Sequence, residues 1–176
     1  MTLILLTLAI VVVMGMAAFS DARDRRIPNA ITVGGVALAL ALRALPGEPT
    51  LAAGLAAAAA GFVVGFPLFA LGGFGGGDAK LLVATGAFLG PRSFVLALVL
   101  IAVLGAVLAV WVMLRRRVAL PALYSTKDAI VYLGTLGRHG SWPTLDQPAP
   151  ITVPYGIAIA LGAVAAWFVP LLDVTL

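Results

Sequence analysis

Residues 93–114 read SFVLALVLIAVLGAVLAVWVML, a run of 22 residues without a charge. A helix needs about 20 apolar residues to cross the hydrocarbon core of a bilayer. Five further apolar blocks are Thr2–Ser20, Ala30–Leu45, Leu51–Leu71, Leu81–Leu89 and Pro154–Leu172. Over all 176 residues, 62% are hydrophobic and only 10% are charged, whereas a soluble domain has about 25% charged residues. This composition excludes a water-soluble monomer and a disordered chain, and it predicts an all-α polytopic membrane protein.

The shortest block, Leu81–Leu89, decides how often the chain crosses. A helix over residues 78–89 would be only about 18 Å long at 1.5 Å per residue. If all six blocks cross, nine Lys and Arg residues lie on one side, and only Arg43 and Arg92 lie on the other. If this block does not cross, the split becomes five to six. Because cytoplasmic loops are enriched in Lys and Arg, the stronger asymmetry predicts six transmembrane helices, with both termini outside.

The connections between the blocks are short except for the stretch 115–150, which this topology places in the cytoplasm. Gly90-Pro91 predicts a break between the fourth and fifth helices. The first half of 115–150 is compatible with an interfacial amphipathic helix and equally with a flexible connector, since Pro121 interrupts it. The first block lacks the basic start of a signal peptide. We therefore predict one transmembrane domain over 1–176.

Several kinds of chemistry are excluded by composition. The chain has no cysteine, which excludes disulfides, thiol nucleophiles and Cys-ligated zinc. The single histidine, His139, disfavours a histidine triad or a histidine metal site. The net charge of +4 is explained by the loop asymmetry rather than by a nucleic-acid partner. No metal or other cofactor is expected, and nothing in the sequence indicates an oligomeric state.

Two of the seven acids, Asp21 and Asp78, lie where a predicted span meets the cytoplasm. Asp21 follows the first block and Asp78 precedes the fourth, so two spans separate them and both return to the same membrane face. Ionisable groups at this depth are costly and are often functional. The alternative is that both are simple boundary charges. Asp24 would share the helical face of Asp21, but its arginine neighbours offer it an exposed ion pair, so we favour Asp21.

The residues before Asp78 read GGFGGG over 72–77. An acid at a helix N-terminus is favourable as a cap and through the helix dipole, but capping does not require five glycines. Glycines allow a close approach of backbone, whether by a substrate or by neighbouring helices. After Asp21, Pro28 disfavours helical geometry at Ile27 and predicts a turn before the second helix.

Two motifs now resemble a known family. The pattern Asp-x5-Ile-Pro-Asn runs from Asp21 to Asn29, and Gly-x-Gly-Asp-x-Lys runs from Gly75 to Lys80. Together they resemble the type IV prepilin peptidases, which belong to the GxGD class of intramembrane aspartyl proteases. The resemblance implies Asp21 and Asp78 as catalytic residues. Substrate-binding or supporting roles are implied for Gly75, Gly77, Lys80, Pro28 and Asn29.

A third element, Val153-Pro154-Tyr155-Gly156, is similar to the family's Pro-Tyr/Phe-Gly-Pro element, with Ile157 where a second proline is frequent. The chain has no cysteine and therefore lacks the two Cys-x-x-Cys pairs of bifunctional members. It resembles the short, peptidase-only members associated with tight-adherence (Flp-type) pili, for which no methyltransferase activity is expected.

The resemblance implies an aspartyl endopeptidase of the bacterial inner membrane. Its substrate would be a prepilin or pseudopilin with a short basic leader and an apolar helix, cleaved at the cytoplasmic boundary. Two neighbouring carboxylates share a proton, so one acts as general base on a water while the other polarises the scissile carbonyl. Because such a dyad titrates as a unit, neither aspartate is assigned as the base.

Three other functions remain compatible with the residues. A proton- or ion-coupled transporter would also use Asp21 and Asp78, although its sites lie more often at the bilayer midplane. A lipid phosphotransferase would use them to hold Mg²⁺. A catalytically silent pilus assembly factor would have the same fold.

Overall fold

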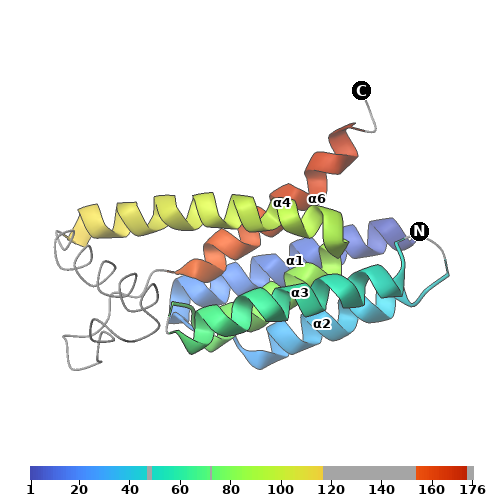
Figure 1. Cartoon of the computed structure of the whole chain (residues 1–176), viewed down its shortest axis with the longest axis horizontal. Helices are drawn as coiled ribbons and strands as arrows, with labels where there is room; N and C mark the ends of the chain where they lie inside the picture. Colours follow the sequence, from blue (N-terminus) through green and yellow to red (C-terminus); the bar gives the residue numbers. More distant parts are fainter. Residues whose placement is uncertain (47–48, 72, 117–153, 174–176) are drawn as a thin grey trace, which may run out of the picture. The chain divides into compact units, whose positions relative to one another are not determined.

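The computed structural model describes residues 1–46, 49–71, 73–116 and 154–173 (Figure 1). In these ranges every regular element is an α-helix: α1 (Thr2–Asp24), α2 (Asn29–Arg43), α3 (Leu51–Ala70), α4 (Gly76–Arg116) and α6 (Tyr155–Asp173). The predicted all-α class is therefore confirmed for the described part of the chain. The stretch 115–150, for which we weighed an interfacial helix against a connector, lies outside the described residues beyond Arg116.

Three helices have the length and composition needed to cross a membrane: Thr2–Asp24, Leu51–Ala70 and Gly76–Val112. Asn29–Arg43 and Tyr155–Pro170 are apolar but shorter. These properties fit a membrane protein. Six spans and external termini remain predictions.

The break predicted at Gly90-Pro91 is present inside α4. Gly90 has a φ of 73° and a ψ of 173°, which is not helical. Glycine tolerates a positive φ because it has no Cβ, and the following Pro91 disfavours helical geometry at the residue before it. α4 thus consists of an inner segment, residues 76–89, and an outer segment that starts at Pro91. Residues 106–116 at the end of α4 belong to a second compact unit, in which Arg115 lies over the Trp111 ring at 4.8 Å.

The inner segment of α4 lies at the centre of the helices. From residue 81 to residue 90 every side chain or glycine is buried except Val83, which is half-buried. On one side, Gly61 of α3 lies so close that a Cβ there would stand 2.6 Å from the Leu82 carbonyl oxygen. On another side, a Cβ at Gly35 of α2 would stand 3.7 Å from the Ala84 Cβ. Because protein surrounds it, this segment of about 21 Å does not depend on lipid contact for its stability.

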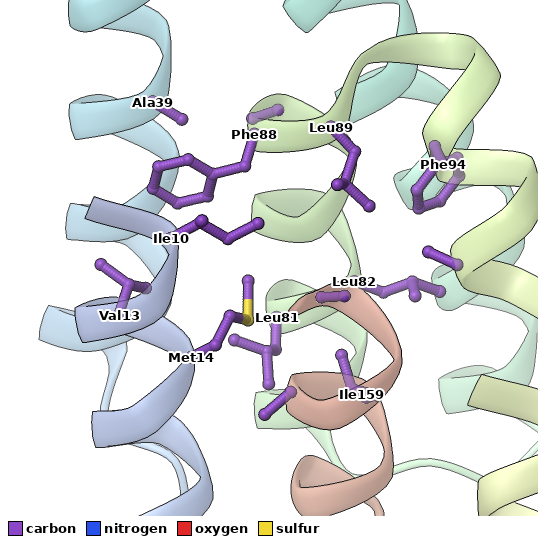
Figure 2. Packing of buried hydrophobic residues seen from close by; sticks show 14 of the residues in the cluster. Ile10, Val13, Met14, Ala39, Leu81, Leu82, Phe88, Leu89, Phe94 and Ile159 are labelled. Atoms are coloured by element: carbon purple, nitrogen blue, oxygen red, sulfur yellow. The ribbon is translucent and has the colours of Figure 1, made fainter. Parts of the chain in front are cut away.

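The core is formed by large apolar residues from several helices (Figure 2). Ile10 and Met14 of α1, Leu81 and Phe88 of α4, and Ile159 of α6 are all buried in one cluster. α6 runs antiparallel to α1, because Trp167 near its end donates a hydrogen bond to Thr7 near the start of α1 (3.0 Å). The start of α6 must then lie beside the C-terminal end of α1.

Arg43, which we placed among the outer charges, is only 3% exposed. Its guanidinium donates to the Phe88 carbonyl at 2.7 Å and to the Thr50 carbonyl at 3.1 Å. Phe88 lies at the C-terminal end of the inner segment, where helix carbonyls lack helical partners and a cation is favourable. Arg43 therefore holds the end of the inner segment that is opposite to Asp78.

Candidate active site

Asp21 lies within α1. We had predicted that it follows the first helix, so this boundary was wrong. The helix continues through Asp24 and ends at Arg25, whose N–H donates to the Asp21 carbonyl at 3.0 Å. Arg25 has a φ of 52°, the left-handed conformation that commonly ends a helix. Asp21 itself is 6% exposed. The last turn of α1 thus positions a buried acid close to the end of the helix.

The turn between α1 and α2 is held by its own hydrogen bond. The Ser20 hydroxyl donates to the Arg26 carbonyl at 2.7 Å. Pro28 has a φ of −59° and a ψ of 144° and directly precedes the first residue of α2, which confirms the turn predicted from Pro28. Ile27 is buried and anchors the turn against the neighbouring helices.

Asp78 is the third residue of α4, which begins at Gly76 and not after Asp78. Its Oδ2 accepts the Gly75 N–H at 3.1 Å, so the side chain reaches back over the helix start as in half of a capping box. The glycine beside it also has a steric role. A Cβ at Gly77 would come within 3.0 Å of the Ile27 Cβ, so glycine lets the start of α4 approach the α1–α2 turn.

The start of α6 holds the side chain of Asp21. The Asp21 Oδ2 accepts the Gly156 N–H at 2.9 Å. The free N–H groups at a helix start and the helix dipole both favour a carboxylate there. A Cβ at Gly156 would stand only 2.8 Å from that Oδ2 and 2.8 Å from the Ile27 Cδ1. The sequence pattern contains Gly156 in the Pro-Tyr-Gly element, but nothing in that pattern indicated a role for it in the site.

Asp21 and Asp78 line one cavity of about 330 Å³, and the negative charge of Asp21 acts on Asp78. We call this hollow the acid cavity; its other lining residues are Arg25, Arg26, Ile27, Gly75, Gly76, Gly77 and Lys80. Asp24 does not line it, and its side chain is 63% exposed and lies 3.8 Å from Arg23. The structure therefore brings together the two acids that the sequence singled out and leaves Asp24 in an exposed ion pair.

Lys80 lies at the rim of the acid cavity and links two helices. Its Nζ donates to the Asn29 Oδ1 at 2.8 Å, and both residues are exposed. Two residues for which the resemblance implied supporting roles thus contact each other across α2 and α4. Pro28, for which the resemblance also implied a supporting role, is exposed at the start of α2.

Among the described residues, no three His, Cys, Asp or Glu side chains gather as potential metal ligands. The acid cavity instead offers two carboxylates, one buried and one half-buried. Its rim carries three cationic side chains, those of Arg25, Arg26 and Lys80. Two carboxylates in a cavity of this size, which has room for water, suit general acid–base chemistry.

The apolar helices fit a membrane protein, and the two acids of the cavity fit hydrolytic chemistry. A comparison with protein families matches residues 8–110 to the type IV leader peptidase family. The match covers more than half of the chain, and the chain belongs to this family. No curated protein and no solved structure matches it significantly. The family and the three long apolar helices together indicate a membrane peptidase.

Proposed function

We propose that this protein is an aspartyl endopeptidase that removes the leader peptide of prepilins at the cytoplasmic boundary of the bacterial inner membrane. Asp21 and Asp78 are its catalytic pair. The observation that carries the proposal is the acid cavity, in which two acids 57 positions apart in the sequence line the same hollow.

The proposed reaction is amide hydrolysis without a covalent intermediate. One carboxylate takes a proton from a water molecule, whose oxygen attacks the scissile carbonyl carbon, while the other carboxyl gives its proton to the carbonyl oxygen. The resulting gem-diol then collapses. The C–N bond breaks as the amine nitrogen takes a proton from the first carboxyl, and the second carboxyl recovers its own. Asp21 and Asp78 exchange the roles of base and acid within one turnover.

The depth of the acids supports a peptidase over a transporter. Asp21 is three residues from the C-terminal end of a 23-residue helix, and Asp78 is in the first turn of α4. Transporter sites lie more often near the bilayer midplane. The acid cavity also lies at the end of the helices that carries Arg25, Arg26 and Lys80. Under the positive-inside rule this end faces the cytoplasm, in agreement with six spans and external termini.

The proposed substrate has a short polar leader followed by an apolar helix, as the family resemblance implies. Cleavage at a membrane boundary suits such a chain, since the scissile bond would lie between its polar and apolar parts. The proposed peptidase is of the tight-adherence (Flp-type) kind, as the resemblance implies. The proposed peptidase lies in the lipid bilayer, and its reaction uses no cofactor.

The test is co-expression with a Flp-type prepilin, followed by separation of the precursor from the mature pilin. Asp21→Asn and Asp78→Asn keep the size of each side chain and remove its acid. Either change is expected to abolish leader removal. Asp24→Asn is the matched control: it removes an acid three residues from Asp21 that does not line the acid cavity, and it is expected to leave processing near the wild-type level. Processing that survives both Asp21→Asn and Asp78→Asn would refute the proposal.

A further inference from the structure

A second hollow, of about 310 Å³, lies beside the acid cavity, on the surface between α3 and α4. Apart from Gly76 and Lys80 its lining is apolar: Phe62, Phe66, Phe69, Ala79 and Val83. We call it the aromatic groove. It differs in character from the acid cavity, which is lined by two acids and three cations.

The two hollows share part of their lining, because Gly76 and Lys80 line both of them. A Cβ added at Gly76 would stand 3.4 Å from the Phe69 ring, so Phe69 lies against the start of α4, close to Asp78. The aromatic groove is therefore the apolar surface next to the acid cavity on the side of α3.

The walls of the groove are rigid aromatic rings along one face of α3. Phe62, Phe66 and Phe69 are spaced four and three residues apart, so they share a face, and the rings of Phe62 and Phe66 stack with centroids 5.3 Å apart. Their exposed fractions are 56%, 52% and 46%. The outer segment of α4, by contrast, exposes aliphatic side chains such as Val95 and Val99. Solvation by lipid requires apolar side chains, but it does not require aromatic ones gathered around a hollow.

We propose that the aromatic groove binds the apolar helix of the substrate, immediately after the scissile bond. This inference rests on the proposed function. A bond cleaved at the acids has a polar leader on one side and an apolar helix on the other, and the apolar helix must leave the acid cavity over an apolar surface. The groove lies next to the cavity and shares Gly76 and Lys80 with it. From residue 62 to residue 69 it follows α3 for about 10 Å, the length of two turns of a bound helix.

The expected gain comes from packing and not from removal of apolar surface from water. Lipid tails are as apolar as the substrate helix, so helices in a membrane associate through close van der Waals contact. Aromatic rings lose few rotamers when they are covered, which makes them suited to such contact. The groove therefore recognises the shape of the first turns of the apolar helix, while Asp21 and Asp78 act on the bond before it.

Cross-linking tests the contact directly, because the chain has no cysteine of its own. Phe66→Cys is compared with Val99→Cys, a residue of similar exposure (57%) on α4 that does not line the groove. Both are placed in the Asp78→Asn background, which is expected to retain uncleaved substrate. The probe is a Flp-type prepilin with one cysteine, two turns after its cleavage site. We expect a disulfide cross-link at position 66 and little at position 99. Equal cross-linking at the two positions, or none at position 66 because lipid fills the groove, would overturn the inference.

A kinetic comparison separates this inference from the proposed function. The double variant Phe62→Ala/Phe66→Ala is assayed on the full prepilin and on a short peptide that contains the leader and cleavage site but no apolar helix. We expect kcat/KM on the prepilin to fall about tenfold, mainly through KM, and kcat/KM on the short peptide to stay at the wild-type value. If the wild-type protein cleaves neither substrate, the proposed function fails. If it cleaves both and the variant loses activity on neither, or equally on both, only the inference fails.

Discussion

Replacement of Gly156 by alanine tests how the carboxylate of Asp21 is held. In the structure the Gly156 N–H donates to the Asp21 Oδ2 at 2.9 Å. An added Cβ would stand 2.8 Å from that oxygen and 3.0 Å from the Asp21 Cβ. Ordinary contact begins near 3.4 Å, so the carboxylate or the start of α6 must move by about 0.6 Å. The Ile27 side chain, also 2.8 Å from the new Cβ, limits movement in its direction.

The expected effect is on catalysis more than on stability. Displacement of a reacting group by about 1 Å costs up to about 100-fold in rate. A hydrogen bond to a charged group contributes about 1.5–3 kcal/mol. If this energy is lost from the transition state alone, the cleavage rate falls by about 10- to 150-fold. We therefore expect Gly156→Ala to lower kcat for leader removal by about 10- to 100-fold. The assay is single-turnover cleavage of a prepilin by the purified protein, with thermal unfolding measured on the same samples.

A glycine six residues further along the same helix provides the matched control. A Cβ at Gly162 would stand 2.6 Å from the Ile101 side chain and 3.0 Å from the Ile101 backbone nitrogen. Neither Gly162 nor Ile101 lines the acid cavity. Gly162→Ala is expected to lower the Tm more than Gly156→Ala does, while the cleavage rate of the folded protein is kept. Wild-type kcat in Gly156→Ala, or an equal loss of kcat in both variants, would refute the view that Gly156 positions the acid.

Three further outcomes are expected. Arg43→Met removes a buried cation that donates to two backbone carbonyls, which costs about 2–4 kcal/mol; thermal unfolding should show a clearly lower Tm than for the exposed Arg92→Met, with leader removal by the folded protein unchanged in both. Lys80→Met, Asn29→Ala and the double variant should lower kcat/KM by the same factor, equivalent to less than about 1 kcal/mol, because all three remove the same exposed hydrogen bond. Additive losses of kcat/KM in a double-mutant cycle would disprove this pairing. Excess EDTA should leave prepilin cleavage unchanged, since the described residues contain no group of three metal-binding side chains; a loss of cleavage that Mg²⁺ restores would refute the metal-free mechanism with two carboxyl groups.

The parts of the structure that follow local rules were predictable from the sequence. Apolar blocks gave the approximate positions of the helices, and Gly90-Pro91 marked the break in α4 because neither residue suits a helix interior. The boundaries near the acids were less accurate. Both α1 and α4 include residues that we had placed in loops, because an acid in a terminal turn gains hydrogen bonds that hydropathy does not measure. The cavity shared by Asp21 and Asp78 agrees with the even number of blocks between them.

Contacts between backbone and side chains that are distant in sequence were not predictable. Nothing in the local pattern shows that the Gly156 N–H meets the carboxylate of Asp21, 135 positions earlier. Arg43 likewise has the composition of a loop charge, and only the packing of α2 against α4 makes it a buried cap for Phe88. Such contacts depend on how the helices pack against one another, which local sequence patterns do not show.

Two helix ends and the α1–α2 turn line the acid cavity, and a third helix end holds one of its acids. The end of α1 carries Asp21, the start of α4 carries Asp78, and the start of α6 donates the Gly156 N–H. The family match stops at residue 110, before α6 begins, yet the Asp21 carboxylate is hydrogen-bonded by α6. Trp167 and Thr7 join the same two helices at their far ends, so α6 is fixed along α1 and is not a loose tail. Because one helix end fixes the carboxylate of another, small shifts of α6 along α1 would change the geometry of the acids. The surroundings of Asp21 therefore include α6 as well as the matched segment.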